Sequence, residues 1–189
     1  MEYTFKNDLF YDKMNKYQII FERDNFIKNM IVISENIEND IRLDVIEKIK
    51  NDIFEKQNAI AFFNSMNKSK HKKMLTPYSP DELSNMKLFK LKGYDIGYAL
   101  KKWNDGSYSE IVAVYNNEKN IKGIGEELMK SAIRNGGRHL DHFDGFLTDF
   151  YSKLGFKEYK RDKYDPKYDE NGEFKSKYGE QDVIYRTLL

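Results

Sequence analysis

The chain of 189 residues contains no cysteine, only three prolines and no long apolar run. Without cysteine, disulfide scaffolds, thiolate nucleophiles and cysteine-bound zinc are excluded. No apolar stretch approaches the roughly 20 residues that a membrane-spanning helix needs, so we expect no membrane partner. The first residues lack the basic-then-apolar layout of a secretory signal, and the expected location is cytoplasmic.

An excess of either charge is also missing, because 32 basic residues accompany 31 acidic ones, giving a formal net charge of +1. Domains that bind nucleic acid by neutralising its phosphates usually carry a basic excess on one face. We therefore expect no nucleic-acid partner.

The first seventy residues contain neither glycine nor proline. Residues 17–34 fit a strand or a helix, and after them apolar residues recur at helical spacing, at Ile41, Val45, Ile46, Ile49 and Ile53. We predict a mostly helical N-terminal region over residues 1–70. The polar stretch from Asn64 to His71 is the best linker candidate, and a second domain is expected over residues 71–189.

After residue 71, glycines and prolines recur as they do where turns join short elements. The predicted elements are a strand at 72–75, a helix start at 76–83, strands at 87–93, 94–103 and 110–115, a helix at 126–137, a strand at 138–143, a helix at 146–156, and strands at 157–164 and 182–189. This order predicts an α+β fold, an α/β arrangement with a mixed and partly parallel sheet.

Gly123 and Gly125 stand one residue apart in the segment NIKGIGEEL, directly before a predicted helix. A helix N-terminus offers unpaired N–H groups and a positive dipole end, and residues without a Cβ let an anion approach them. The P-loop pattern is missing, and G-x-G-x-x-G fails because Leu128 occupies the third glycine position. The glycines therefore predict either a phosphate cradle or a tight strand-to-helix turn.

A second motif follows in FYSKLGFKEY, with Tyr151, Gly155 and Phe156. Together the two motifs resemble the GNAT superfamily of acetyl-coenzyme A-dependent N-acyltransferases, over roughly residues 72–189. Members carry Gln/Arg-x-x-Gly-x-Gly/Ala before a helix and Tyr-x-x-x-Gly-Phe near a later one. Asn120 departs from the first motif, because it stands where members carry Gln or Arg, and its side chain is shorter than either. The segment 136–156 further resembles GNAT-like proteins of phages and other mobile elements.

The resemblance implies a GNAT-like fold with splayed central strands. It also implies transfer of an acetyl group from acetyl-CoA directly to an amine acceptor, either a small molecule or a protein, without a covalent enzyme intermediate. The pantetheine arm is expected along the fourth strand, at Val112, Ala113 and Val114. The diphosphate is expected on the turn that contains Asn120, Ile121, Lys122, Gly123, Ile124, Gly125 and Glu126, where Lys119 adds charge.

Within the same resemblance, Tyr151 is the expected general acid and Glu110 the expected general base. Asp141 and Asp144 are rival bases. Each assignment has a structural alternative, because Tyr151 could pack between helix and sheet and Glu110 could be a charged strand-edge residue.

The cluster HLDHFD raises the question of a metal site. Side chains alternate along a strand, so His139 and Asp141 face one side whereas His142 and Asp144 face the other. No face carries three ligands, and we expect no metal. Trp103, the single tryptophan, is expected to pack against a hairpin.

The opposing hypothesis is a noncatalytic GNAT-like binding module, phage-encoded in origin, that acts through its N-terminal region. In that case a protein partner would engage residues 1–70.

Overall fold

The computed structural model describes residues 16–169 and 172–189. The chain divides into two compact units, Met1–Leu43 and Asp44–Leu189. The first described element is helix α2 (Lys16–Lys50), so residues 17–34 are helical. The first fifteen residues of the predicted N-terminal region lie outside the described residues, and the assignment of domains to 1–70 and 71–189 stays a prediction. In the described ranges no helix has both the length and the apolar character needed to cross a bilayer.

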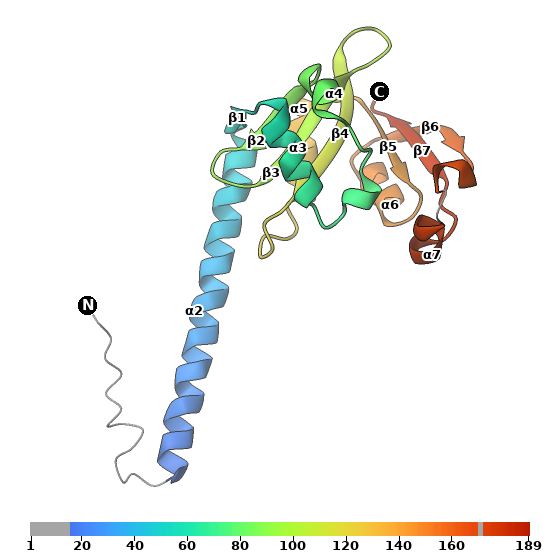
Figure 1. The fold of residues 1–189 in the computed structure, drawn as a ribbon. Coiled ribbons are helices and arrows are strands. Elements are labelled where there is room, and N and C mark those ends of the chain that lie inside the picture. Colours follow the sequence, from blue (N-terminus) through green and yellow to red (C-terminus); the bar gives the residue numbers. More distant parts are fainter. Residues whose placement is uncertain (1–15, 170–171) are drawn as a thin grey trace. The chain divides into compact units, whose positions relative to one another are not determined.

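A mixed sheet forms the centre of the second unit (Figure 1). Its seven described strands lie in the order β1-β2-β3-β4-β5-β7-β6. Every neighbouring pair is antiparallel except β4 and β5, which are parallel, so the predicted mixed α/β fold is confirmed. The strands are β1 (Phe54–Lys56), β2 (Lys87–Leu91), β3 (Ile96–Lys102), β4 (Tyr108–Asn116), β5 (His139–Phe143), β6 (Lys157–Asp162) and β7 (Val183–Thr187).

Helices cover both faces of this sheet (Figure 1). On one face, α3 (Ala59–Lys68) and α4 (Pro80–Ser84) bury Phe62, Met66 and Leu83 against β3 and β4. On the other face, α5 (Gly125–Arg134) and α6 (Phe146–Lys153) pack with the last turns of α2, from which Val45 and Ile49 are fully buried. The short elements are η1 (Lys72–Met74), η2 (Pro166–Tyr168) and α7 (Glu173–Tyr178).

A capping motif in the sequence explains where α4 begins, and a contact from a distant residue satisfies the end of α2. Ser79 and Glu82 form a reciprocal capping box that starts α4 immediately before Pro80. The C-terminal end of α2 leaves carbonyl groups without helical partners, and Arg134 of α5 donates to the carbonyl of Ile49 at 2.9 Å. The same arginine pairs with Asp52 at 3.1 Å, which fixes α5 against the turn that follows α2.

Two expectations for residues 64–75 are wrong. The stretch Asn64–His71 is not a linker, because α3 continues to Lys68 and buries Met66 in the sheet's second core. The predicted strand at 72–75 is instead the single 3-10 turn η1. The sheet also begins earlier than predicted, since β1, which lies within the first seventy residues, pairs with β2.

Strand β4 carries two irregularities where it pairs with β3. The register shifts between Gly97 and Ala99 and again between Lys101 and Lys102, each time with an extra residue on β4. Ala113, inside the first bulge, has φ of 51°, a value that few residues with a side chain adopt. On its other edge β4 pairs with β5 at one described position, Glu110 with His139. The central strands therefore separate beyond Glu110, as predicted.

Gly97 lies where β3 faces this bulge. A substitution at Gly97 therefore tests how tightly β3 packs against its neighbours. A Cβ at Gly97 would stand 2.4 Å from the carbonyl oxygen of Phe89 and 2.9 Å from the hydroxyl of Tyr115. We expect Gly97→Ala to lower the free energy of unfolding by about 1–3 kcal/mol, measured by urea denaturation. The matched control is Gly125→Ala, whose Cβ would come no closer than 3.7 Å to Phe150. Equal stability of the two variants would contradict this account of the bulge.

Candidate functional site

A pocket of about 270 Å³ opens where β4 ends and the glycine turn begins. Its lining includes Val114 at the end of β4, and Ile121, Lys122 and Gly123 from the turn. The structure thus brings together four of the residues predicted to hold the cofactor. Val112 and Ala113 lie further along β4, and neither Glu110 nor Tyr151 lines this pocket.

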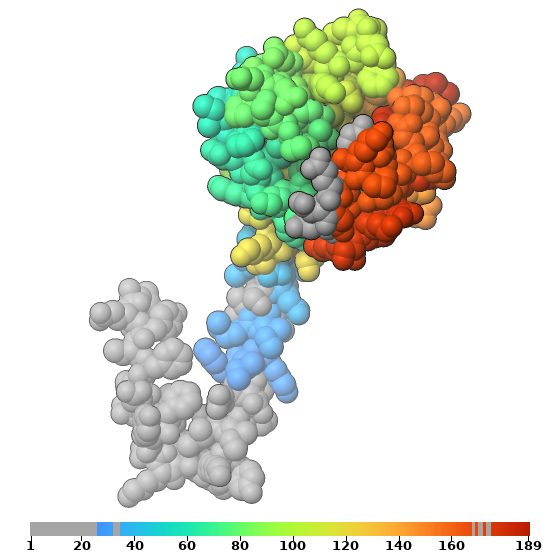
Figure 2. Space-filling model, turned by 45° about the vertical axis from the view of Figure 1, so that its right-hand side comes forward, coloured from blue at the N-terminus to red at the C-terminus, as the bar shows by residue number. Residues whose placement is uncertain are grey.

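The turn is anchored by its apolar side chains and leaves its backbone open. Ile121 and Ile124 are buried in the main core, whereas Lys122, Gly123 and Gly125 are exposed. Gly123 has φ of 71°, which favours glycine. Figure 2 shows the segment near residue 120, coloured yellow, at the surface of the second unit. The isoleucines therefore contribute to any ligand site through the backbone alone.

The first amide groups of α5 are available as donors. In the described part of the chain, the backbone N–H groups of Ile124, Gly125, Glu126 and Glu127 have no acceptor. Ile124 caps the helix without a side-chain hydrogen bond. Such a helix end combines free donors with the positive end of the helix dipole, which is the environment that phosphate oxygens prefer.

The charges around the turn are mixed. Lys70, His71, Lys119 and Lys122 line the pocket, and all four are exposed. The exposed carboxylate of Glu126 would disfavour an anion, but Lys130 pairs with it at 2.7 Å. Asn120 is exposed in the turn and does not line the pocket. The lysines therefore supply the positive charge that the shorter Asn120 side chain does not.

Two carboxylates lie on the edges where β4 and β5 separate. Glu110 of β4 is half-buried and pairs with Lys101 at 3.2 Å. Asp141 of β5 is exposed to water. Surrounding protein atoms nevertheless raise the pKa of Asp141 by desolvation, and the charge on Glu110 raises that pKa further. These two groups are therefore close enough to interact electrostatically.

Tyr151 lies half-buried on α6 among aromatic rings. Its ring centroid is 5.1 Å from that of His142 and 5.2 Å from that of Phe150. Phe150 also lies beside the position where Gly125 would carry a Cβ, so this part of α6 adjoins the start of α5. No described group hydrogen-bonds to the Tyr151 hydroxyl. Burial, with a smaller contribution from the charge on Asp141, raises the pKa of Tyr151 to about 12, so the phenol stays protonated at neutral pH.

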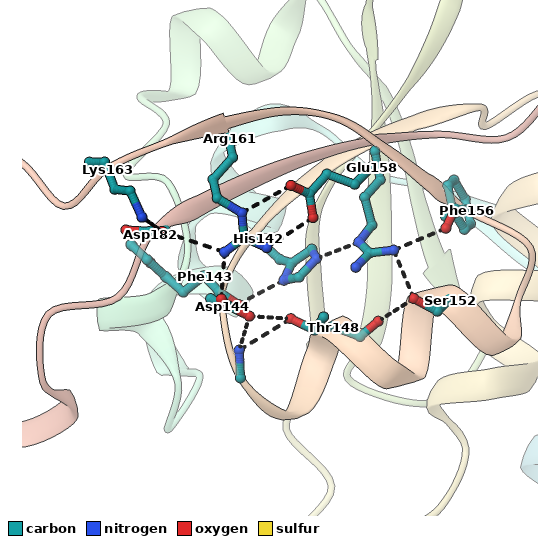
Figure 3. Close-up of polar contacts among 12 residues, drawn as sticks. His142, Phe143, Asp144, Thr148, Ser152, Phe156, Glu158, Arg161, Lys163 and Asp182 are labelled. Atoms are coloured by element: carbon teal, nitrogen blue, oxygen red, sulfur yellow. Dashed lines mark hydrogen bonds and ion pairs between the residues drawn. The ribbon is translucent and has the colours of Figure 1, made fainter.

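A buried arginine ties the second motif to the sheet (Figure 3). Arg186 of β7 is 4% exposed and donates to His142 Nε2 at 2.9 Å, to the Ser152 hydroxyl at 2.9 Å and to the Phe156 carbonyl at 3.0 Å. His142 Nδ1 lies 2.7 Å from the Phe143 carbonyl, so the neutral ring donates there and accepts from Arg186. Arg186 thus fixes both the helix that carries Tyr151 and the ring beside it.

Asp144 belongs to a separate surface network (Figure 3). Its carboxylate accepts from the Thr148 hydroxyl at 2.7 Å and pairs with Arg161 at 2.6 Å. These two interactions, with the hydroxyl making the larger contribution, lower the pKa of Asp144 to about 2. A carboxylate held this firmly in its charged form is a poor proton acceptor, so Asp141 is the stronger rival of Glu110.

His139, the remaining polar residue of β5, packs against an aromatic ring. The His139 ring stacks on the Trp103 ring with centroids 4.0 Å apart, which accounts for Trp103 as a packing residue of the hairpin before β4. Among the described residues no group of three or more histidines and carboxylates is arranged to hold a metal ion.

Sequence reasoning missed two contributors to this region. Residues 69–71 line the pocket although they were predicted to be a linker. The basic residues of this stretch, Lys70 among them, allowed a solvated linker or, as the alternative, a nucleic-acid or phosphate contact, but nothing in the order of elements placed them near Gly123. Arg186 gave no signal, because an arginine on a predicted strand ordinarily faces water.

The Arg186–His142 contact makes stability depend on pH. Burial lowers the pKa of His142 and the nearby Arg186 lowers it further, whereas an unfolded histidine protonates near pH 6.5. The unfolded chain therefore binds the extra proton first, so the free energy of unfolding falls as pH drops below about 6.5, by at most about 1.4 kcal/mol per pH unit for this group.

We expect His142→Gln to reduce this slope in urea denaturation between about pH 7.5 and 5.5, because glutamine can still accept from Arg186 but does not titrate. His139, whose pKa is also lowered by burial, keeps its contribution in both proteins. The matched control is His71→Gln, at an exposed position. An unchanged slope in His142→Gln would show that His142 is not held neutral.

The chain was compared with known proteins. No protein-family model matches the sequence, and no curated protein matches it. In structure the chain is similar to N-acetylglutamate synthase from Neisseria gonorrhoeae complexed with coenzyme A and L-arginine, with 17% identity and a TM-score of 0.44 over 71% of this chain and 32% of the synthase. It is also similar to a GNAT family acetyltransferase from Elizabethkingia anophelis with acetyl-CoA bound, with 23% identity and a TM-score of 0.39 over 60% of this chain and 84% of the other. The chain therefore spans about a third of the length of the synthase.

Proposed function

We propose that the second unit is an N-acetyltransferase that moves an acetyl group from acetyl-CoA directly to an amine. The observation that carries the proposal is the open end of α5, where unpaired amide donors and exposed Gly123 and Gly125 adjoin a lysine-lined pocket at the end of β4. The Tyr-x-x-x-Gly-Phe motif on neighbouring α6 supports it, as does the separation of β4 from β5.

In this proposal the diphosphate lies on the N–H groups of Gly123 to Glu126, and Lys119 and Lys122 add long-range attraction. The pantetheine arm runs along the free edge of β4, where the bulge at Ala113 turns backbone groups away from β3. Acetyl-CoA supplies the activated thioester carbonyl. The chain supplies the orientation, because backbone donors on a strand and a helix end hold the ligand without side-chain rearrangement.

Glu110 is the proposed base. Its carboxylate takes the proton of the acceptor ammonium, which frees the nitrogen lone pair for attack. Lys101 pairs with the Glu110 carboxylate at 3.2 Å, and the acceptor's own cation competes for the same carboxylate. Asp141 faces the same gap and adds negative charge, so the site favours an acceptor that arrives as a cation.

Tyr151 is the proposed acid. With a pKa of about 12 it remains a donor at neutral pH, and it stabilises negative charge on the departing sulfur by a hydrogen bond. Arg186 and His142 hold its helix and its ring in place.

A second candidate function is a GNAT-like module that engages a protein partner without catalysis. The exposed apolar side chains of α2, outside the proposed catalytic unit, favour it. The test is to measure acetyl-CoA binding and then CoA release in the presence of a panel of amines that includes small amines and lysine peptides. Binding without release would support this second function over the first.

The cofactor assignment predicts that Gly125→Ala weakens CoA binding. The added Cβ has room within the protein, with its nearest neighbour at 3.7 Å, but it occupies the space that a phosphate needs to reach the amides. We expect the dissociation constant of CoA, measured by titration calorimetry, to rise about tenfold or more. Gly106→Ala, in the hairpin between β3 and β4, is the control with no expected effect on CoA. Unchanged affinity in Gly125→Ala would remove the turn from the site.

The acid assignment predicts that Tyr151→Phe lowers kcat about 100-fold while the affinity for acetyl-CoA changes little, because the ring packing is retained and only the donor is lost. CoA release against the best amine of the panel measures this. Tyr159→Phe, on β6 and 49% exposed, is the matched control. A Tyr151→Phe enzyme within threefold of the original rate would rule out the phenol as the acid.

The base assignment predicts that Glu110→Gln flattens the acidic limb of the kcat/KM profile and lowers kcat/KM near pH 7 about 100-fold. Asp141→Asn serves as the comparison, because Asp141 is the rival carboxylate on the facing strand. If Asp141→Asn abolishes the acidic limb while Glu110→Gln retains it, the base is Asp141.

A further inference from the structure

The pocket at the end of β4 carries more positive charge than the proposed diphosphate contacts use. Its described lining includes one carboxylate, from Glu118, and three lysines, Lys70, Lys119 and Lys122. One oxygen of the Glu118 carboxylate accepts from the backbone N–H of Asp95 at 2.8 Å, so that oxygen is directed to the backbone. In the proposed function the diphosphate lies on backbone amides of the glycine turn, and Lys119 and Lys122 add attraction. Lys70 has no role there.

Lys70 and its neighbour His71 belong to an anchored turn, residues 69–71, which we call the basic turn. Ser69, at the end of α3, is 5% exposed, and its hydroxyl accepts from the backbone N–H of His71 at 3.2 Å. The Ser69 carbonyl accepts from the backbone N–H of Lys72 at 3.1 Å. The side chains of Lys70 and His71 are exposed, and the ion pairs of the described residues do not include Lys70. The basic turn therefore offers a cation on a fixed backbone.

Two asparagines hold the basic turn and the glycine turn at the same pocket. The Asn117 side chain donates to the Ser65 carbonyl at 2.7 Å, which ties the segment after β4 to the last turn of α3. The Asn116 side chain donates to the Ile121 carbonyl at 2.7 Å and accepts from the backbone N–H of Glu118 at 3.0 Å. The backbone around the pocket is thus fixed by contacts within the protein, which lowers the entropy cost of binding a ligand there.

The pocket has room for one end of the coenzyme. Its volume of about 270 Å³ corresponds to about nine water molecules at roughly 30 Å³ each, which suits a sugar phosphate rather than a whole CoA molecule. Besides its diphosphate, CoA carries a phosphate on the 3′ position of its ribose, and this ribose is joined directly to the diphosphate. Two phosphate groups so close repel each other unless cations lie between or beside them.

We propose that the basic turn binds the 3′-phosphate of the coenzyme. The Lys70 ammonium supplies a positive charge and up to three donors, and the His71 ring supplies a further N–H donor. A phosphate monoester carries nearly two negative charges at neutral pH and accepts several such bonds. The subsite rests on the proposed acetyl-CoA function and adds to it a preference for the 3′-phosphorylated coenzyme.

The test compares CoA with dephospho-CoA, which lacks only the 3′-phosphate. In titration calorimetry at low ionic strength, the original chain should bind CoA about tenfold more tightly than dephospho-CoA. Lys70→Gln should reduce this preference to about threefold or less by weakening CoA alone, whereas Lys70→Arg keeps the charge and should retain most of it. The matched control is Lys92→Gln, at an exposed lysine between β2 and β3, and it should leave both affinities unchanged.

The outcomes separate the subsite from the function on which it rests. If the original chain binds both coenzymes equally, or if Lys70→Gln/His71→Gln keeps the full preference, the basic turn does not hold the 3′-phosphate, although the acetyl-CoA proposal stands. If neither coenzyme binds at millimolar concentration, the proposed function and the subsite both fail. Equal affinities together with binding of a single-stranded oligonucleotide that Lys70→Gln weakens would make the basic turn a nucleic-acid contact and overturn the proposal.

Discussion

The irregular backbone of β4 is the constraint on which the proposed site depends. Two bulges against β3, one with Ala113 at φ of 51°, add twist to the strand in the middle of the sheet. β5 pairs with it at Glu110 and then diverges. A regular strand would continue the hydrogen-bond ladder and close the gap. Without that gap, the end of β4 beyond Glu110 would be covered by backbone pairing.

The glycine turn and the second motif are each anchored by buried side chains. Buried Ile121 and Ile124 anchor the turn, so its exposed amides keep their positions although the turn has little secondary structure of its own. Arg186 anchors α6 through Ser152 and Phe156. Burying a guanidinium among neutral acceptors is costly unless every contact is made, so this position tolerates little change. Preorganisation of this kind is what a site needs when backbone donors rather than mobile side chains bind the ligand.

Much of the fold followed from local patterns in the sequence. The strands from Lys87 onward, helix α5 and helix α6 follow periodicity and glycine positions. The two motifs predicted that the glycine turn and Tyr151 belong to one site, and this stays a prediction. The predictions for residues 64–75 were wrong because this stretch is mostly polar and basic in sequence. Its helix is stabilised by Phe62 and Met66, which pack against the sheet and not against residues nearby in the chain. The three-residue β1 was missed because its pairing with β2 comes from residues more than thirty positions away. Asp141 and Asp144 were both rival bases in the sequence, and the contacts of Asp144 with Thr148 and Arg161 appear only in the structure.

The most direct test of the account is an amide-resolved NMR titration of the full chain with acetyl-CoA. We predict that the largest shifts arise at the amides of Val112 to Val114 and of Gly123 to Glu126, and that saturation occurs at micromolar to low-millimolar ligand. Shifts confined to other parts of the chain, or none at millimolar acetyl-CoA, would contradict a coenzyme site between β4 and α5.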